Sequence, residues 1–432
     1  MRVRVRPADR GLTGTVRMPG DKSISHRAAI LGALAEGQTA VEGFLPGRDC
    51  LATLRVLAQL GVEVERPAAD RVVIRGRGDQ LREPEEVLDA ENSGTTARLL
   101  LGVLAGLEGV AVVTGDRSLR RRPMGRVTEP LGAMGATFLG RESAARLPLA
   151  VRGRRPLRAG NFRLPVASAQ VKSALLLAGL RAEGVTAVWE PYRSRDHTER
   201  MLPGFGCPVE EDESGTLTVT GPAQLLGTRV SVPADPSSAF FFVVAALLVS
   251  GSEVRLPGVG LNPTRLGALE VLRRMGARIE VTELAERNGE PRGMLVARSG
   301  PLRAVEVLPE EVPALIDEVP VLAVAAAAAE GTTVFRGVGE LRHKESDRLS
   351  ALELELRRLG IEAEATDDSL FVTGGRLRGG VVLSHGDHRI AMALAVAGLA
   401  SREGVEVRGA ECVAISFPQF FGLLGSVAPG SL

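Results

Sequence analysis

The stretch "GDKSISHRAAILGALAEGQTAVEG", residues 20–43, contains the unit from which the fold is predicted. It opens with Asp21, Lys22 and Ser23, continues as an apolar run, and passes through Gly37 into a β-rich segment. Asp and Ser are preferred helix N-caps, and a run that is apolar nearly all round is typical of a buried helix. The stretch therefore predicts a buried helix with a polar N-terminus, followed by a strand.

This unit recurs along the chain. Similar apolar helices followed by glycine are expected six times, with the closing glycines at positions 37, 109, 184, 251, 331 and 404. A second, amphipathic helix follows each one, closed by glycines 61, 135, 206, 276, 360 and 425. All twelve glycines are expected as left-handed helix caps. The spacing of about 72 residues, which is 432 divided by six, indicates six α/β units, although generic α/β alternation is the alternative. Because 432 residues exceed one ordinary core, two domains of three units are expected.

Composition excludes several classes of protein. The net charge of +1 and the aromatic content of 3% disfavour nucleic-acid binding. No apolar run has the length and flanks of a membrane span, and the N-terminus has no apolar signal segment. Cys50, Cys207 and Cys412 stand far apart and indicate free thiols in a reducing compartment.

Lysine is rare, which makes its positions informative. The chain has three lysines, Lys22, Lys172 and Lys344, against 50 arginines. Genomic codon preference explains an arginine bias, but lysine is a compact ammonium that arginine does not replace at every site. Lys22 and Lys344 are therefore candidate site residues, whereas Lys172, near the start of a buried helix, could be structural.

The starts of the buried helices point to anions. They read "DKSISHR", "ENSGTTAR", "ASAQVKS", "ADPSSA", "IDEVP" and "GDHR". Free N–H groups at a helix N-terminus favour negative ligands, and Lys22, Arg27, Arg98 and Arg389 add cations. Helices whose N-termini converge on a cleft between two domains would bind small, multiply charged anions.

Other clusters keep two interpretations. The loop 115–126, with five arginines in ten residues, is either an anion site or a solvated basic loop, and Pro123 is expected early in a helix. Asp317 is either an N-cap or a general base. Lys344 and Arg348, four residues apart, are expected on one helix face.

A metal site is the remaining alternative among these clusters. It would use the H-x-x-H of "SHGDHRIAM", residues 384–392, but further ligands are missing nearby. No nucleotide-binding fingerprint and no nucleophile triad is readable.

Taken together, "GDKSISHRA", "ENSGTTARLL", "RPMGR", "SAQVKSALLLAGL", "LRHKESDRL" and "GDHRIAMALA" resemble the 5-enolpyruvylshikimate-3-phosphate synthases, in a divergent bacterial branch. The resemblance implies an α/β, two-domain enolpyruvyl-transferase fold of six βαβαββ repeats, three per domain, with buried helices directed at an interdomain cleft. One domain would comprise residues 1–19 and 234–432, and the inserted domain residues 20–233, with crossings near 18–22 and 233–237.

The resemblance also implies the reaction and its residues. The 5-hydroxyl of shikimate 3-phosphate would add to C2 of phosphoenolpyruvate, and phosphate would leave the tetrahedral intermediate. Asp317, Glu345 and Lys22 would be catalytic. Shikimate 3-phosphate would contact Lys22, Ser23, Arg27, Ser168, Ala169, Gln170, Ser194, Asp317 and Lys344. Phosphoenolpyruvate would contact Lys22, Asn92, Gly94, Arg122, Gln170, Arg348 and Arg389. The resemblance further implies a cytoplasmic monomer of chorismate biosynthesis, without metal, cofactor, nucleic-acid or membrane partner.

The chain departs from the family pattern at Ile415, where many members have lysine, so a phosphoenolpyruvate cation would be missing or supplied by Arg120 or Arg121. Gly94 leaves room for glyphosate, and inhibition is expected. Two rivals remain. The sister transferase acting on UDP-N-acetylglucosamine typically has a cysteine in the loop that is 115–126 here, and this loop has none. A non-catalytic anion- or RNA-binding protein would have no use for carboxylates such as Asp317 and Glu345.

Overall fold

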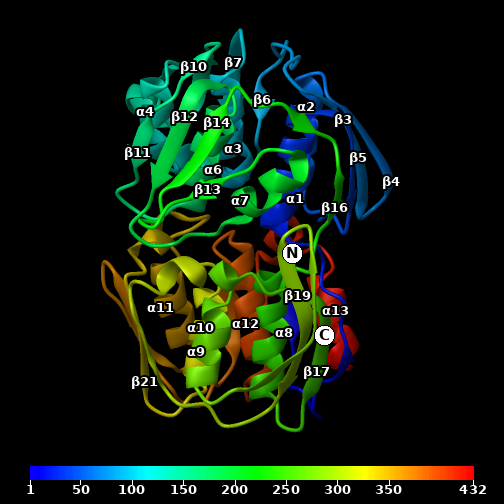
Figure 1. Ribbon diagram of the computed structural model, residues 1–432. Coiled ribbons are helices and arrows are strands. Elements are labelled where there is room, and N and C mark those ends of the chain that lie inside the picture. The colour runs from blue at the N-terminus through cyan, green and yellow to red at the C-terminus, as the bar shows by residue number, and fades with distance from the viewer. The chain divides into compact units, whose positions relative to one another are not determined.

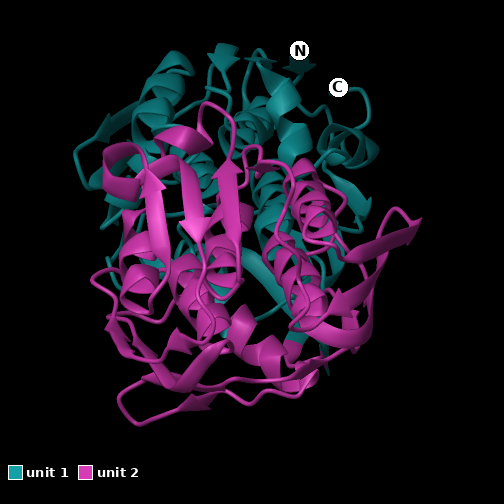
Figure 2. Ribbon diagram, turned by 90° about the horizontal axis from the view of Figure 1, so that it is seen from above, with its two compact units in different colours: residues 1–19, 233–286, 291–432 teal, residues 20–232, 287–290 magenta.

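The computed structural model describes residues 1–432 and divides into two compact units. Unit 1 comprises residues 1–19, 233–286 and 291–432, and unit 2 comprises residues 20–232 and 287–290 (Figure 2). Each unit has its own hydrophobic core. The chain therefore passes between the units near Pro19 and Val232, and again at both ends of the short segment 287–290.

One series of helices is buried except for half-buried residues near the helix ends, as the apolar runs predict. The series consists of α1 (Lys22–Leu34), α3 (Gly94–Ala105) and α6 (Ala169–Gly179) in unit 2, and α8 (Pro236–Leu248), α10 (Val319–Ala327) and α12 (His388–Ala400) in unit 1. In unit 1 the three buried helices pack against one another, and in unit 2 α3 packs against both α6 and α1 (Figure 1). Such helices offer a ligand only their ends.

The helices of the second series are amphipathic, and each exposes one face to solvent, again as predicted. It consists of α2 (Arg48–Gln59), α4 (Gly125–Ala133), α7 (His197–Met201), α9 (Gly267–Arg274), α11 (Arg348–Arg358) and α13 (Phe420–Val427). A one-turn helix α5 (Arg141–Ala144) and the 3₁₀ helices η1 (Leu119–Arg121), η2 (Leu202–Phe205), η3 (Pro263–Arg265), η4 (Val312–Ala314), η5 (Gly339–His343) and η6 (Ala410–Ile415) complete the helical elements.

Unit 2 contains three mixed sheets. The first has the order β15-β3-β5-β4, with β16 also on β3, and is formed by β3 (Ala35–Glu42), β4 (Glu63–Ala68), β5 (Arg71–Arg77), β15 (Leu225–Leu226) and β16 (Arg229–Ser231). The second, β6-β7-β9-β8, uses β6 (Leu88–Asp89), β7 (Val110–Thr114), β8 (Thr137–Gly140) and β9 (Arg146–Arg152). The third, β10-β12-β14-β13, uses β10 (Leu157–Arg158), β12 (Ala182–Trp189), β13 (Glu210–Glu211) and β14 (Leu217–Gly221), with β11 (Asn161–Arg163) on β12.

Unit 1 also contains three sheets, and the N-terminal segment completes two of them. The sheet β18-β19-β17-β2 uses β2 (Thr13–Thr15), β17 (Glu253–Gly260), β18 (Arg278–Arg287) and β19 (Glu290–Arg298). The sheet β20-β21-β23-β22 uses β20 (Glu306–Val307), β21 (Thr332–Arg336), β22 (Glu362–Ala365) and β23 (Ser369–Thr373). The sheet β1-β25-β24 uses β1 (Arg2–Val5), β24 (Gly380–Leu383) and β25 (Val405–Arg408). The predicted α/β class is confirmed, and no helix is long and apolar enough to cross a bilayer.

Five of the twelve predicted glycine caps are correct. Glycines 61, 135, 276 and 360 follow the C-caps of α2, α4, α9 and α11, and Gly206 caps η2, all with positive φ as predicted. Gly425, however, lies inside α13. The six glycines of the buried series also have positive φ but cap no helix; Gly37 and Gly184 lie within β3 and β12. The prediction was wrong there because α1 ends directly in extended backbone at Ala35, and the left-handed residue comes inside the strand.

Two further local predictions were wrong. Pro123 lies between η1 and α4, so it does not begin a helix. Lys344 is the extended residue after η5, whereas Arg348 begins α11, so the two share no helix face. The spacing of four residues misled because the chain leaves helical geometry between them.

The close approach of α3 and α6 gives a test of the packing. A Cβ at Gly102 would lie 2.3 Å from the carbonyl oxygen of Ala174, whereas a Cβ at Gly132 of α4 would meet nothing within 4 Å. We expect Gly102→Ala to lower the unfolding free energy of unit 2 by about 2–3 kcal/mol. Gly132→Ala, the matched control, should leave it unchanged or raise it by up to ~1 kcal/mol. Differential scanning calorimetry of both variants measures this, and equal melting temperatures would contradict the close approach.

Candidate functional site

Polar caps occupy the N-termini of the buried helices. The side chains of Asp21, Ser93, Ser168, Asp235 and Asp387 each accept a hydrogen bond from a backbone N–H in the first turn of α1, α3, α6, α8 and α12. The sixth helix, α10, has Glu318 at this position without a side-chain cap bond, so Asp317 is not its N-cap. The predicted cap types are confirmed at five of the six starts, and the N-cap interpretation of Asp317 is wrong.

Arg27 is a buried cation without an anionic partner. Its Nε donates to Thr198 Oγ1 at 2.7 Å, its Nη2 to Ser173 Oγ at 2.7 Å, and its Nη1 to the carbonyl oxygen of Ser23 at 3.1 Å. All three acceptors are neutral. Burial lowers the pKa of Arg27 to about 10, with Arg195 contributing in the same direction and Glu199 opposing, so the group stays charged at neutral pH. A buried charge on neutral acceptors is stabilised when an anion binds beside it.

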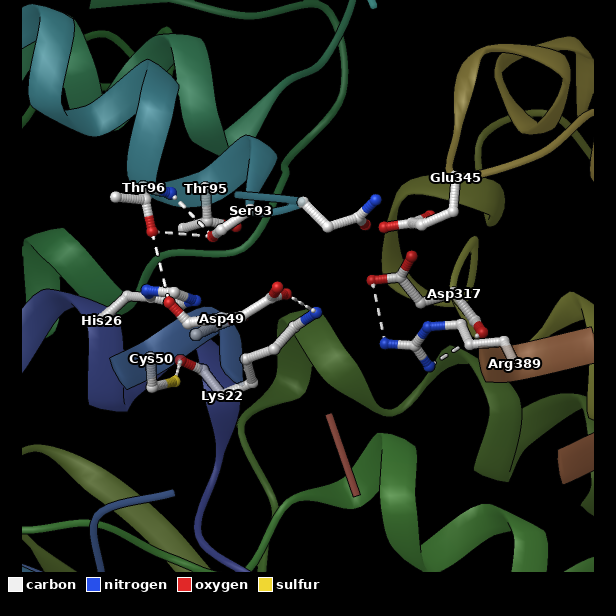
Figure 3. Close-up of polar contacts among 12 residues, drawn as sticks. Lys22, His26, Asp49, Cys50, Ser93, Thr95, Thr96, Asp317, Glu345 and Arg389 are labelled. Carbon is white, nitrogen blue, oxygen red and sulfur yellow. Dashed lines mark hydrogen bonds and ion pairs between the residues drawn. The ribbon is translucent and has the colours of Figure 1, made fainter. Parts of the chain in front are cut away.

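Two further cations lie at the same helix start. Lys22 Nζ forms an ion pair with Asp49 Oδ2 at 3.0 Å (Figure 3). Arg195 Nη1 lies 3.4 Å from Ser23 Oγ. The N-terminus of α1 thus has three cations nearby: Arg195 contacts the hydroxyl of Ser23, Arg27 contacts its carbonyl oxygen, and Lys22 precedes it in the chain. Together they are a suitable set of donors for a phosphate.

A second set of donors lies at the start of α3, also in unit 2. Arg122 Nη2 donates to Asn92 Oδ1 at 3.1 Å. A Cβ on Gly94 would lie 2.9 Å from Arg98 Nη1 and 3.1 Å from Arg122 Nη1, so both guanidinium groups flank this glycine. Two arginine forks beside a helix N-terminus match the geometry of a carboxylate or phosphate.

Gln170 connects α3 to α6. Its Oε1 accepts from Arg98 Nη1 at 2.7 Å and its Nε2 donates to Thr95 Oγ1 at 2.9 Å. Ser168 and Ala169 are the N-cap and the first residue of the same helix α6. The structure therefore places Gln170 next to both predicted sets of substrate contacts within unit 2.

Unit 1 contains the predicted acid–base residues. Asp317 Oδ2 lies 3.6 Å from Arg389 Nη2 (Figure 3). Its Oδ1 lies 3.5 Å from Arg348 Nη1. The carbonyl oxygen of Asp317 accepts from Arg389 Nη1 at 3.0 Å. Glu345 Oε2 pairs with Arg348 Nη2 at 2.6 Å. Two predicted proton carriers thus contact one buried guanidinium.

Arg348 is held by carboxylates on all sides. Its side chain is 1% exposed, and its Nε also pairs with Asp387 Oδ2 at 2.7 Å. Burial opposes its charge, but Asp387, Glu345 and Asp317 outweigh burial and raise the pKa of Arg348. The same contact with Arg348 lowers the pKa of Asp387 against the effect of burial. Arg348 is thus paired with three carboxylates, those of Asp317, Glu345 and Asp387.

The remaining predicted residues are more dispersed. Lys344 is half-buried next to Glu345, and Ile415 ends η6. Arg120 and Arg121, the predicted substitutes for a lysine at 415, are exposed. No group of three or more histidine, cysteine, aspartate or glutamate side chains has the arrangement of a metal site.

Comparison with known proteins identifies the family. A sequence model described as EPSP synthase (3-phosphoshikimate 1-carboxyvinyltransferase) matches residues 7–424. The 3-phosphoshikimate 1-carboxyvinyltransferase of Pelotomaculum thermopropionicum is 57% identical over 97% of both chains. The chain belongs to the EPSP synthase family.

Solved structures agree with this membership of the EPSP synthase family. An EPSP synthase from Acinetobacter baumannii is 42% identical, with a TM-score of 0.87, over 99% of this chain and 98% of that chain. The enolpyruvyl transferase NikO from Streptomyces tendae, at 22% identity and a TM-score of 0.80 over 99% of this chain and 97% of that one, shows the shared fold alone.

Sequence reasoning about this EPSP synthase family member missed Arg195 and Asp49, and left Arg98 out of the predicted contacts. Arg195 follows the predicted contact Ser194, and Arg98 follows the start of α3 by one turn. Both are single arginines in an arginine-rich chain, so only their long-range contacts with Ser23 and Gln170 distinguish them.

A buried chain of hydroxyls joins α1 to the start of α3. His26 Nδ1 contacts Thr53 Oγ1 at 2.7 Å, Thr53 Oγ1 contacts Thr96 Oγ1 at 2.7 Å, and Thr96 Oγ1 contacts Ser93 Oγ at 2.7 Å. Burial, with the charges of Lys22 and Arg27, holds the pKa of His26 well below 6.5. The imidazole is therefore neutral in the folded protein.

His26 gives a test by pH. Below about pH 6.5 the unfolded chain binds a proton at this histidine and the folded chain does not, so stability falls as the pH falls. We expect the wild type to lose about 1 kcal/mol more per pH unit between pH 6 and 5 than His26→Gln. Chemical denaturation at pH 7, 6 and 5 measures the difference. Identical pH profiles would show that His26 is protonated in the folded state.

Proposed function

We propose that this chain transfers the enolpyruvyl group of phosphoenolpyruvate to the 5-hydroxyl of shikimate 3-phosphate, releasing phosphate, as expected of an EPSP synthase. The observation that carries the proposal is Arg27, a buried guanidinium on neutral acceptors beside Ser23 and a helix N-terminus. A substrate with a phosphate group supplies the missing negative charge.

In unit 2, the start of α1 is proposed as the phosphate site of shikimate 3-phosphate. Ser23 and Arg27 bind the phosphate, Arg195 adds a cation, and Ser168, Ala169, Gln170 and Ser194 contribute from α6 and from the segment before α7. Lys22 reaches phosphoenolpyruvate once it leaves Asp49. This exchange of one anion for another keeps the ammonium paired throughout.

The start of α3 is the proposed phosphoenolpyruvate site. Asn92, Gly94, Arg122 and Gln170 surround it, and Arg98 lies beside Gly94. Arg348 and Arg389 of unit 1 are also proposed as phosphoenolpyruvate contacts. Phosphoenolpyruvate carries a phosphate and a carboxylate, so two arginine forks bind it better than one point charge.

The chemistry is assigned to Asp317 and Glu345. Asp317 takes the proton of the 5-hydroxyl as its oxygen bonds to C2 of phosphoenolpyruvate, and Glu345 gives a proton to the methylene C3. The resulting tetrahedral intermediate loses phosphate when a proton returns from C3 to Glu345 and the double bond re-forms, and the phosphate leaves with the proton that Asp317 took from the 5-hydroxyl. Lys344 contacts the shikimate moiety next to Glu345.

The two compact units are proposed as the two predicted domains, with the first crossing at Pro19–Gly20 and the second at Val232–Pro233. The proposed binding residues at the starts of α1, α3 and α6 lie in unit 2 and the proposed proton carriers in unit 1, so the proposed reaction would use residues of both units. A monomer in the cytoplasm would suffice for this reaction.

Phosphate release tests the proposed function. We expect release from phosphoenolpyruvate to require shikimate 3-phosphate, and kcat to fall by about 10²- to 10⁴-fold in Asp317→Ala, because general base catalysis is lost. Asp367→Ala, which removes an exposed carboxylate of unit 1, is the matched control and should keep full activity.

The alternatives give different outcomes in the same assay. Release that requires UDP-N-acetylglucosamine in place of shikimate 3-phosphate would assign the sister reaction. If neither shikimate 3-phosphate nor UDP-N-acetylglucosamine supports phosphate release, the proposed reaction is refuted, although the fold is unaffected.

A further inference from the structure

Lys172 is the one lysine of the chain for which the proposed reaction has no role. It lies in the first turn of α6 and is 1% exposed. Its Nζ lies 2.6 Å from Glu190 Oε1, 2.8 Å from Glu199 Oε1 and 3.4 Å from the carbonyl oxygen of Ser194. The ammonium therefore makes two hydrogen bonds, to Glu190 and Ser194, and an ion pair with Glu199. A planar guanidinium cannot point at three separate acceptors from so compact a volume, which explains a lysine here in an arginine-rich chain.

The same contacts fix the backbone of Ser194 on both sides. Glu190 Oε1 accepts from the backbone N–H of Ser194 at 2.8 Å, while Lys172 donates to its carbonyl. The Ser194 hydroxyl also contacts Glu190, at 2.9 and 2.7 Å from its two carboxylate oxygens. A hydroxyl has one hydrogen to donate, so a phosphate that accepts a hydrogen bond from Ser194 must replace Glu190 as the acceptor. The backbone bonds persist while the hydroxyl turns, so Ser194 keeps its position during the exchange.

Lys172 also sets the position of α7, and through it Arg27. Glu199 pairs with Lys172, and next to them Ser173 Oγ and Thr198 Oγ1 lie 2.7 Å apart. These two hydroxyls are the acceptors of Arg27 Nη2 and Nε. The Lys172–Glu199 pair therefore fixes the register of α7 against α6 at the point where both helices hold the buried guanidinium.

The charges of this cluster support the arrangement. Burial opposes the charge of Lys172, but Glu199 and Glu190 outweigh burial and raise its pKa, so the ammonium is kept at neutral pH. One cation and two carboxylates leave a net charge of −1. Glu199 favours the charged form of Arg27, so the excess negative charge acts on the proposed phosphate-binding residue.

We propose that Lys172, through Glu190 and Glu199, is a positioning residue that holds Ser194 and Arg27 in place for the phosphate of shikimate 3-phosphate. The proposal rests on the proposed function and deepens its phosphate site. Lys172 itself contacts no substrate, since its ammonium is held by Glu190, Ser194 and Glu199.

The test measures the effects of Lys172→Met and Glu190→Ala on shikimate 3-phosphate and on phosphoenolpyruvate separately. Lys172→Met removes the ammonium and keeps the length of the side chain, and Glu190→Ala keeps the Lys172–Glu199 pair but frees the backbone of Ser194. We expect KM and the calorimetric Kd for shikimate 3-phosphate to rise about ten- to a hundredfold in both, the loss of a charge-assisted bond. KM for phosphoenolpyruvate and kcat should stay within about twofold of the wild type. Lys172→Arg should fail to restore the affinity, because charge alone is insufficient.

A purely structural role is excluded by a matched control. Val151→Ala removes core volume from β9 in another sheet of unit 2 and lowers the melting temperature without touching the phosphate site. It should leave KM for shikimate 3-phosphate unchanged. If the Lys172 and Glu190 variants bind shikimate 3-phosphate like the wild type, or lose kcat and both KM values together in step with their melting temperatures, the positioning role is refuted.

Failure of the underlying function gives a different result. If the wild-type protein itself neither binds shikimate 3-phosphate in the calorimeter nor releases phosphate in its presence, the proposed function fails and the positioning role fails with it. If the wild type binds shikimate 3-phosphate, the proposed phosphate site stands, and the Lys172 and Glu190 variants then test the positioning role separately.

Discussion

The structure depends on the burial of one whole helix in every repeat. A helix that is apolar on all sides has no solvated face, so its ends are the places where polar groups occur. At the N-terminal end the free N–H groups must be satisfied, and Asp21, Ser93, Ser168, Asp235 and Asp387 do so with one side chain each. The residues next to these caps then carry the charges. The six buried helices therefore form the core, and five of them carry a polar cap at the N-terminus.

Desolvation determines what the charges can do. Arg348 is surrounded by three carboxylates, which raise its pKa and fix its geometry. Arg27 has neutral acceptors only, and its pKa is lowered by burial. In the first arrangement the charge of the guanidinium is balanced by carboxylates, among them the proposed proton carriers Asp317 and Glu345. The second is electrostatically incomplete, and for that reason it is the better indicator of an anionic substrate.

Lysine and arginine have separate tasks in this chain. Arginine forks lie where flat, two-point contacts are made, as Arg98 and Arg122 do beside Gly94. Lys172 lies where three acceptors converge on one point. The rarity of lysine in the sequence signalled such a site, but did not reveal that Lys172 holds Ser194 and the register of α7. That role depends on Glu190 and Glu199, which are 18 and 27 residues away in the chain.

The sequence by itself determined the α/β class, the alternation of buried and amphipathic helices, the polar caps and the family, because these are properties of local pattern and of motif order. The sequence-based predictions were wrong where the backbone geometry changes within a few residues. This holds for the helix face expected to be shared by Lys344 and Arg348, and for the helix cap expected at Gly37, which lies inside β3. Only the tertiary structure decided that Arg27 lacks an anionic partner, that Arg195 lies against Ser23, and that Asp317 lies between Arg348 and Arg389. Each of these facts joins residues far apart in the chain, and burial and pairing energies arise from such contacts, which no local pattern specifies.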